Sequence, residues 1–119
     1  MSLIIYHNPS CSKSRKTLEI IQSSGVTPRV VEYLRTPPDA QTLLDIAALL
    51  GIPLLDLLRR GEEDFLNAAE GVPLDDDRAL ATWLHAHPQV LQRPIVVDEA
   101  RSRAVIGRPP ENVLDLLRA

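Results

Sequence analysis

The first thirty-three residues constrain the fold of this chain more than any other part. Residues Leu3 to Tyr6 are apolar and rich in β-branched side chains, which is typical of a short buried strand. Asn, Pro and Ser in the segment 7–10 end that strand, and from Ser12 the residues favour a helix that Gly25 stops. A second strand is expected over residues 29–33. Strand, helix and strand in this order predict a right-handed βαβ unit with parallel strands.

The rest of the chain predicts a helical block and then a hairpin. Between residues 36 and 92 apolar positions recur at helical spacing, and Asp39 is a plausible N-cap of the first helix. Strands are expected at 93–97 and 104–106, antiparallel because only a short turn joins them, and a last helix at 113–117. The sequence therefore predicts an α/β fold with a mixed four-stranded sheet and flanking helices, which is a thioredoxin-like arrangement.

Length and composition are consistent with one domain over residues 1–119, with 36–92 as a helical insertion between the second and third strands. A chain of 119 residues that is 45% apolar can bury a core without a disulfide or a metal. The net charge of −3 argues against nucleic acid as a partner, and no apolar run is long enough to cross a membrane. The start has no signal-peptide pattern, and a single cysteine cannot form an internal disulfide, so we expect a cytoplasmic protein.

Cys11 is the residue most suited to chemistry. A lone cysteine is more often an inert buried side chain, but this one is expected at a strand–helix turn. The N–H groups and the partial positive charge of a helix N-terminus favour a thiolate there, and Arg15 adds positive charge. We predict that Cys11 is a nucleophile, that Ser14 and Arg15 offer donors to an oxyanion, and that His7 either supports the sulfur or is only a turn residue.

Three arginines are candidates for binding an oxyanion. Arg is the side chain whose planar fork of donors fits such an anion, and several cationic donors are needed to stabilise negative charge in a transition state. Taken singly, an arginine is more often a solvated surface charge. The three arginines are Arg59, Arg93 and Arg108. In a thioredoxin-like fold the turn before the third strand faces the cysteine loop, and this favours Arg93 among them. We expect no metal and no bound cofactor.

The segment 7–15, His-Asn-Pro-Ser-Cys-Ser-Lys-Ser-Arg, resembles the active-site loop of the glutaredoxin-coupled arsenate reductases. In that family the pattern is His-Asn-Pro-x-Cys-x-x-Ser-Arg. The segments 57–59, 93–97 and 107–111 resemble the three stretches of the family that carry its oxyanion arginines, in the same order along the chain.

This resemblance implies a thioredoxin-like fold with a helical insertion and a nucleophilic Cys11. It implies reduction of arsenate to arsenite, with glutathione as cosubstrate and glutaredoxin as the external reductant. It also implies a cis peptide bond before Pro94 and three arsenate-binding arginines at Arg59, Arg93 and Arg108. Arg60 stands beside Arg59, so the choice between these two is open. Lys13 replaces a small residue often found in the family, and it would either help to bind an anion or crowd it.

Three other functions differ from this one in the residues that they require. A phosphatase-like arsenate reductase is excluded, because it needs an Arg six residues after the Cys, where this chain has Thr17, and further cysteines. An Spx-like regulator that binds RNA polymerase is an alternative, although Ser14 replaces the second cysteine of its redox-switched members. A glutathione-dependent thiol-disulfide oxidoreductase is another, and it would need Cys11 but not the three arginines.

Overall fold

The computed structural model describes residues 2–68 and 71–118 of the chain. The chain divides into two compact units, one made of Met1–Thr36 and Arg93–Ala119, the other of Pro37–Gln92. One domain over residues 1–119 stays a prediction. None of the helices in the described ranges has both the length and the apolar character needed to cross a membrane.

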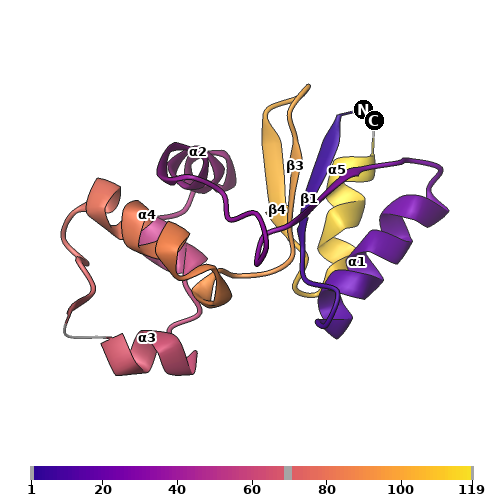
Figure 1. Ribbon diagram of the computed structural model, residues 1–119. Coiled ribbons are helices and arrows are strands. Elements are labelled where there is room, and N and C mark those ends of the chain that lie inside the picture. The colour runs from indigo at the N-terminus through magenta and orange to yellow at the C-terminus, as the bar shows by residue number, and fades with distance from the viewer. Residues whose placement is uncertain (1, 69–70, 119) are drawn as a thin grey trace. The chain divides into compact units, whose positions relative to one another are not determined.

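The first unit contains a mixed four-stranded sheet in the order β2-β1-β3-β4 (Figure 1). Strand β1 is parallel to β2 and antiparallel to β3, and β3 is antiparallel to β4. Ile5 at the centre of β1 lies opposite Val30 of β2 and Val96 of β3. The predicted thioredoxin-like sheet is therefore confirmed. The strands are β1 (Leu3–His7), β2 (Arg29–Glu32), β3 (Ile95–Asp98) and β4 (Arg103–Ile106).

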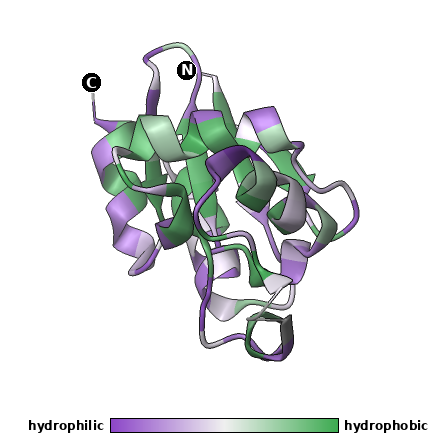
Figure 2. Ribbon diagram, turned by 90° about the vertical axis from the view of Figure 1, so that its left-hand side faces the viewer, coloured by the Kyte–Doolittle hydropathy of each residue, from purple (hydrophilic) through white to green (hydrophobic). Residues whose placement is uncertain are grey.

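Helices α1 (Ser12–Ser23) and α5 (Leu114–Leu117) lie side by side against the sheet (Figure 1). The strands are mostly hydrophobic (Figure 2), and all five residues of β1 are buried. The predicted final helix 113–117 begins instead as a 3₁₀ turn, η4 (Pro110–Val113), which leads into α5. The core of the unit consists of Leu3, Ile5, Ile21, Val96, Val113 and Leu116.

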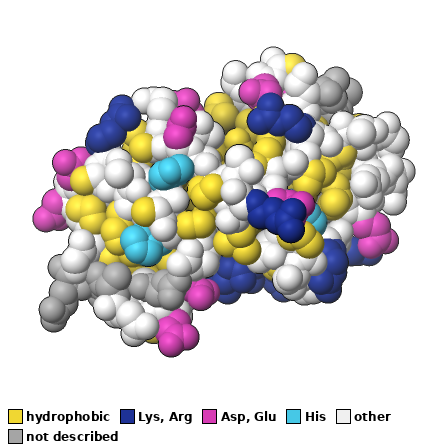
Figure 3. Space-filling view, in the orientation of Figure 1, with side chains coloured by type: hydrophobic (Ala, Val, Ile, Leu, Met, Phe, Trp, Pro, Cys, Tyr) yellow, Lys and Arg dark blue, Asp and Glu magenta, His cyan; other side chains and the backbone are white. Residues whose placement is uncertain are grey.

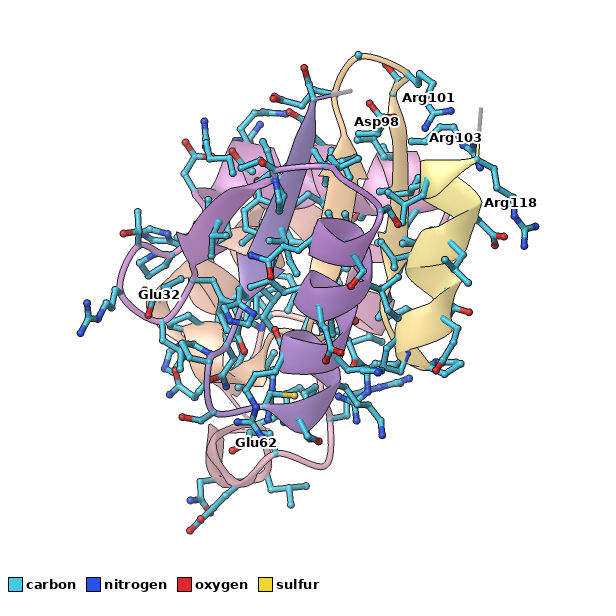
Figure 4. The ribbon with its side chains drawn as sticks, turned by 90° about the vertical axis from the view of Figure 1, so that its right-hand side faces the viewer. Glu32, Glu62, Asp98, Arg101, Arg103 and Arg118 are labelled. Atoms are coloured by element: carbon cyan, nitrogen blue, oxygen red, sulfur yellow. The ribbon has the colours of Figure 1, made fainter. Side chains whose placement is uncertain are left out.

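A buried ion pair fixes the hairpin between β3 and β4 to the end of α5. The carboxylate of Asp98 is fully buried, and Arg101 Nε donates to its Oδ2 at 2.6 Å. Burial raises the pKa of Asp98, but the hydrogen bonds from Arg101 outweigh burial and lower it. The same guanidinium donates to the carbonyl of Leu116 and, at 2.8 Å, to that of Arg118. Figure 4 shows Asp98, Arg101 and Arg118 together at this end of the sheet.

The second unit is helical, as predicted, and its helix ends follow local sequence signals. Asp39 Oδ1 accepts a hydrogen bond from Thr42 N at 2.8 Å at the start of α2, and Gly51, with φ of 69°, ends that helix. The sequence also predicts a turn of helix over residues 65–69, which corresponds to α3, and the last of these residues lies outside the described ranges. The elements are α2 (Ala40–Leu50), η1 (Leu54–Leu57), α3 (Glu63–Ala68), α4 (Asp77–Ala86) and η3 (Pro88–Val90).

Two backbone hydrogen bonds hold the end of this unit to the segment after η1. Arg59 N donates to Val90 O at 2.6 Å, and Gln92 N donates to Leu57 O at 2.7 Å. The position of Arg59 within its unit is therefore fixed by backbone pairing.

Apolar side chains also reach the surface of the unit, as Figure 3 shows, and Leu66 is 61% exposed.

Candidate active site

Cys11 is the N-cap residue of α1, in the extended conformation with φ of −95° and ψ of 122°. The loop before it is tightly hydrogen-bonded. Cys11 N donates to Asn8 O at 3.0 Å, and Ser10 N donates to the side-chain oxygen Asn8 Oδ1 at 3.0 Å. Arg15 Nη1 donates to Pro9 O at 2.9 Å. The loop thus presents a half-buried Cys11 side chain at the beginning of a twelve-residue helix.

The surroundings of the sulfur favour the thiolate. Partial burial raises the pKa of Cys11, because a charged sulfur is less well solvated there. The backbone N–H groups of Ser14 and Lys13 and the guanidinium of Arg93 interact with the sulfur and outweigh burial, so the pKa of the Cys11 thiol is lowered. A lowered pKa increases the fraction of the nucleophilic form near neutral pH.

His7 and Ser14 form a buried pair behind the nucleophile. His7 Nδ1 and Ser14 Oγ share a hydrogen bond of 2.6 Å, and Asn8 N donates to the same hydroxyl at 3.0 Å. Burial lowers the pKa of His7, the charge of Glu32 raises it, and Arg15 lowers it, with a net decrease that keeps the imidazole neutral at pH 7. Since Ser14 also provides an N–H to the sulfur, this pair holds the first turn of α1 in place under Cys11.

Arg93 and Arg108 come together from the two sides of the β3–β4 hairpin. Arg108 Nη1 donates to the carbonyl of Arg93 at 3.2 Å. The Arg93–Pro94 peptide bond is cis, as the family resemblance implied, and so is the Arg108–Pro109 bond, which the sequence did not indicate. Among the described residues, Arg93 Nε is a buried donor without a hydrogen-bond partner. A guanidinium that lowers the pKa of the thiol and keeps a donor unused is suited to binding an anion at the sulfur.

The other predicted residues have individual partners. Arg15 uses one guanidinium nitrogen on the Pro9 carbonyl, and Lys13 is exposed. In the second unit, half-buried Arg59 pairs with Glu62 at 3.3 Å, whereas the more exposed Arg60 pairs with Asp56 at 3.7 Å. Metal binding receives no support from the described residues, since no three of their His, Cys, Asp and Glu side chains cluster closely enough to hold an ion.

Sequence reasoning missed two features of the site. Asn8 holds the loop with both its carbonyl and its side-chain oxygen, and the preference of Asn for turns was the available signal. Gly107 packs directly on Thr17 of α1. These residues are distant in the sequence, so no local pattern predicts their contact. Asn8 thus holds the loop that carries Cys11, and Gly107 brings the turn after β4 close to α1.

Comparison with known proteins gives consistent results. The ArsC family matches residues 6–116. The chain is 42% identical over 118 residues to an arsenate reductase of Escherichia coli, with 98% of this chain and 81% of that protein covered. It is 46% identical over 116 residues to an uncharacterized protein of Escherichia coli strain K12, YfgD, with 95% and 94% covered. An arsenate reductase from Vibrio cholerae has a similar structure, with a TM-score of 0.89, 40% identity and 97% of each chain covered.

Proposed function

This chain belongs to the ArsC family, and on that premise we propose that it is an arsenate reductase, which reduces arsenate to arsenite through the thiolate of Cys11. Relatives that carry this name are 42% and 40% identical to it over nearly its whole length. The observation that carries the proposal is the place of Cys11 as the N-cap of α1, where Arg93 and the N–H groups of Ser14 and Lys13 lower the pKa of its thiol. The same groups that stabilise the thiolate are suited to stabilise an oxyanion bound to it.

In the first step the Cys11 thiolate attacks the arsenic of arsenate. A sulfur–arsenic bond forms, the hydroxyl group of arsenate takes up a proton from the solvent and leaves as water, and arsenic remains pentavalent. Arg93 and Arg108 neutralise the charge of the remaining oxygens. Neutral His7 and buried Ser14 keep the first turn of α1 in position and do not exchange protons with the substrate.

In the second step a glutathione thiol attacks the adduct. A sulfur–sulfur bond forms between Cys11 and glutathione, the sulfur–arsenic bond breaks, and its two electrons remain on arsenic, which leaves as arsenite. The chain contains a single cysteine, so a thiol from another molecule must resolve the intermediate. Glutathione therefore acts as a cosubstrate without any bound cofactor, and glutaredoxin restores the free thiol. This cycle suits the cytoplasm, where glutathione keeps thiols reduced.

Arg59 is proposed as an arsenate-binding residue on the strength of the sequence segment 57–59 alone. Its pairing with Glu62 leaves its guanidinium less exposed than that of Arg60. Replacing each of these adjacent arginines by alanine is a matched test, because only Arg59→Ala is expected to raise the KM for arsenate. The role of Arg15 is proposed to be mainly in the loop, through its bond to the Pro9 carbonyl.

The first experiment is to measure arsenite formed from arsenate by the purified protein with glutathione, glutaredoxin and an NADPH-recycling system. Turnover is expected, and the matched Cys11→Ser variant should show none. Absence of turnover in the wild-type protein, with Cys11 still rapidly alkylated near neutral pH, would overturn arsenate as the substrate. That result would favour a thiol-disulfide oxidoreductase or an Spx-like regulator.

A further inference from the structure

Gly107, the residue directly after β4, has no room for a side chain. It is buried, and a Cβ placed on it would lie 2.5 Å from Thr17 Oγ1, 2.8 Å from Pro94 Cγ and 3.2 Å from Thr17 Cγ2. Ordinary van der Waals contacts between heavy atoms lie at about 3.5–4.0 Å, so the first two distances are clashes and the third is a tight contact. Only glycine allows the turn after β4 to approach α1 this closely.

The atoms around Gly107 are held and do not readily yield. Thr17 is fully buried and its hydroxyl donates to Lys13 O at 2.8 Å, so the side chain is fixed against its own helix. Pro94 is a rigid ring, and its carbonyl accepts a hydrogen bond from Gly107 N at 2.9 Å. A larger residue at 107 would therefore displace the turn and leave α1 and β3 where they are.

The residues on each side of this contact are those of the proposed anion site. Arg108 follows Gly107, Arg93 precedes Pro94, and Cys11 lies on α1 six residues before Thr17. Arg108 is also bonded to the Arg93 carbonyl. The close contact thus joins, at one point, the three segments whose side chains must meet at one oxyanion.

We propose that Gly107 and Thr17 are a positioning pair for the proposed reaction, which sets the reach of the Arg108 guanidinium to the anion at Cys11. This inference rests on the proposed function. Neither residue touches the substrate. The pair determines how far the turn that carries Arg108 stands from the N-terminal turn of α1, while the Cys11 thiolate is stabilised by groups that lie on α1 and before β3.

The test uses Gly107→Ala, with Gly71→Ala as a matched control because a Cβ at Gly71 meets nothing within 4 Å. Arsenate binding is measured without glutathione, from the protection of Cys11 against iodoacetamide, and the KM from turnover. Protection by arsenate is expected to weaken about tenfold or more in Gly107→Ala, since a displacement near 1 Å can cost on the order of 10²-fold. The pH midpoint of Cys11 alkylation is expected to stay unchanged, and Gly71→Ala should behave as the wild type.

Second-site variants separate positioning from simple misfolding. In the Gly107→Ala background, Thr17→Ala removes two of the three close atoms, Oγ1 and Cγ2, and is expected to recover part of the protection. Thr17→Ser keeps the hydroxyl oxygen at 2.5 Å and should not recover it. Unchanged arsenate protection in Gly107→Ala, or equal recovery by both second-site variants, would overturn the inference alone. Wild-type protection without arsenite formation would overturn the proposed function alone, and no protection in the wild type would overturn both.

Discussion

The N-cap residues of α1 and α2 both have an extended backbone, but the two helix N-termini bind different partners. At α2 the carboxylate of Asp39 accepts a hydrogen bond from Thr42 N, and α4 begins in the same way with Asp76 and Ala79 N. At α1 the N-cap is Cys11, whose side chain makes no capping hydrogen bond. The N–H groups of α2 and α4 thus stabilise the fold, whereas those of α1 remain available to a thiolate and its substrate, at a cost in helix stability of about 1 kcal/mol.

The largest effect is expected when α1 is made to resemble α2. Cys11→Asp should abolish arsenate turnover, because no thiolate remains, and should raise the free energy of unfolding by about 1 kcal/mol, because a carboxylate at the N-cap accepts the free N–H groups. The matched variant Cys11→Ala should lose activity equally without becoming more stable. Arsenite assays and urea denaturation measure the two effects. Equal stability of both variants would show that the N–H groups of α1 are not available to an anion.

A smaller loss is expected when only the cation facing Cys11 is removed. Arg93→Ala should lower kcat/KM for arsenate on the order of 10²–10³-fold, as does removal of one oxyanion donor in other enzymes. It should also move the pH midpoint of Cys11 alkylation upward, because Arg93 helps to lower the pKa of this thiol. Arg93→Lys keeps the charge but not the planar fork, and should recover the pKa more than the turnover. An unchanged kcat/KM for arsenate in Arg93→Ala would contradict the role of Arg93 in stabilising the oxyanion.

The smallest effect concerns the acid stability of the cap on α2. Hydrogen bonds from the N–H and hydroxyl of Thr42 lower the pKa of Asp39 below its ordinary value of 3.8. Asp39 therefore contributes stability above pH 3.8, and this contribution is lost as the pH falls through the lower folded-state pKa. Asp39→Asn should keep a cap that does not titrate, so its urea midpoint should fall less in acid than that of the wild type. Parallel acid profiles for the two proteins would contradict this role.

Local patterns were enough to predict the elements that surround the nucleophile. Apolar β-branched residues followed by a turn that contains Pro predicted β1 and the start of α1. Asp39 is the N-cap of α2 as predicted, and Gly51 ends that helix. These features depend on neighbouring residues in the sequence, so they can be predicted without the structure. The mixed sheet followed from the order of its strands and the lengths of their connections.

Features that depend on contacts between distant segments were not predictable. The pairing of Arg108 with the Arg93 carbonyl and the contact of Gly107 with Thr17 arise only when β4 lies beside β3 and α1. The bonds from Arg101 to the carbonyls at the end of α5 belong to the same class. Proline at the start of the last helix signalled a boundary, but not that the first turn is 3₁₀.

Strand β3 has a fixed point at each end. Pro94, just before it, is packed against Gly107, and Asp98, its last residue, is buried in its pair with Arg101. Three residues, Ile95 to Val97, separate these anchors and act as a spacer of set length, since each residue advances the strand by about 3.3 Å. Adding or removing one residue would turn the buried carboxylate to the opposite face and pull Arg93 away from the sulfur. We therefore expect this stretch of the chain to accept exchanges between apolar residues during evolution, but not insertions or deletions.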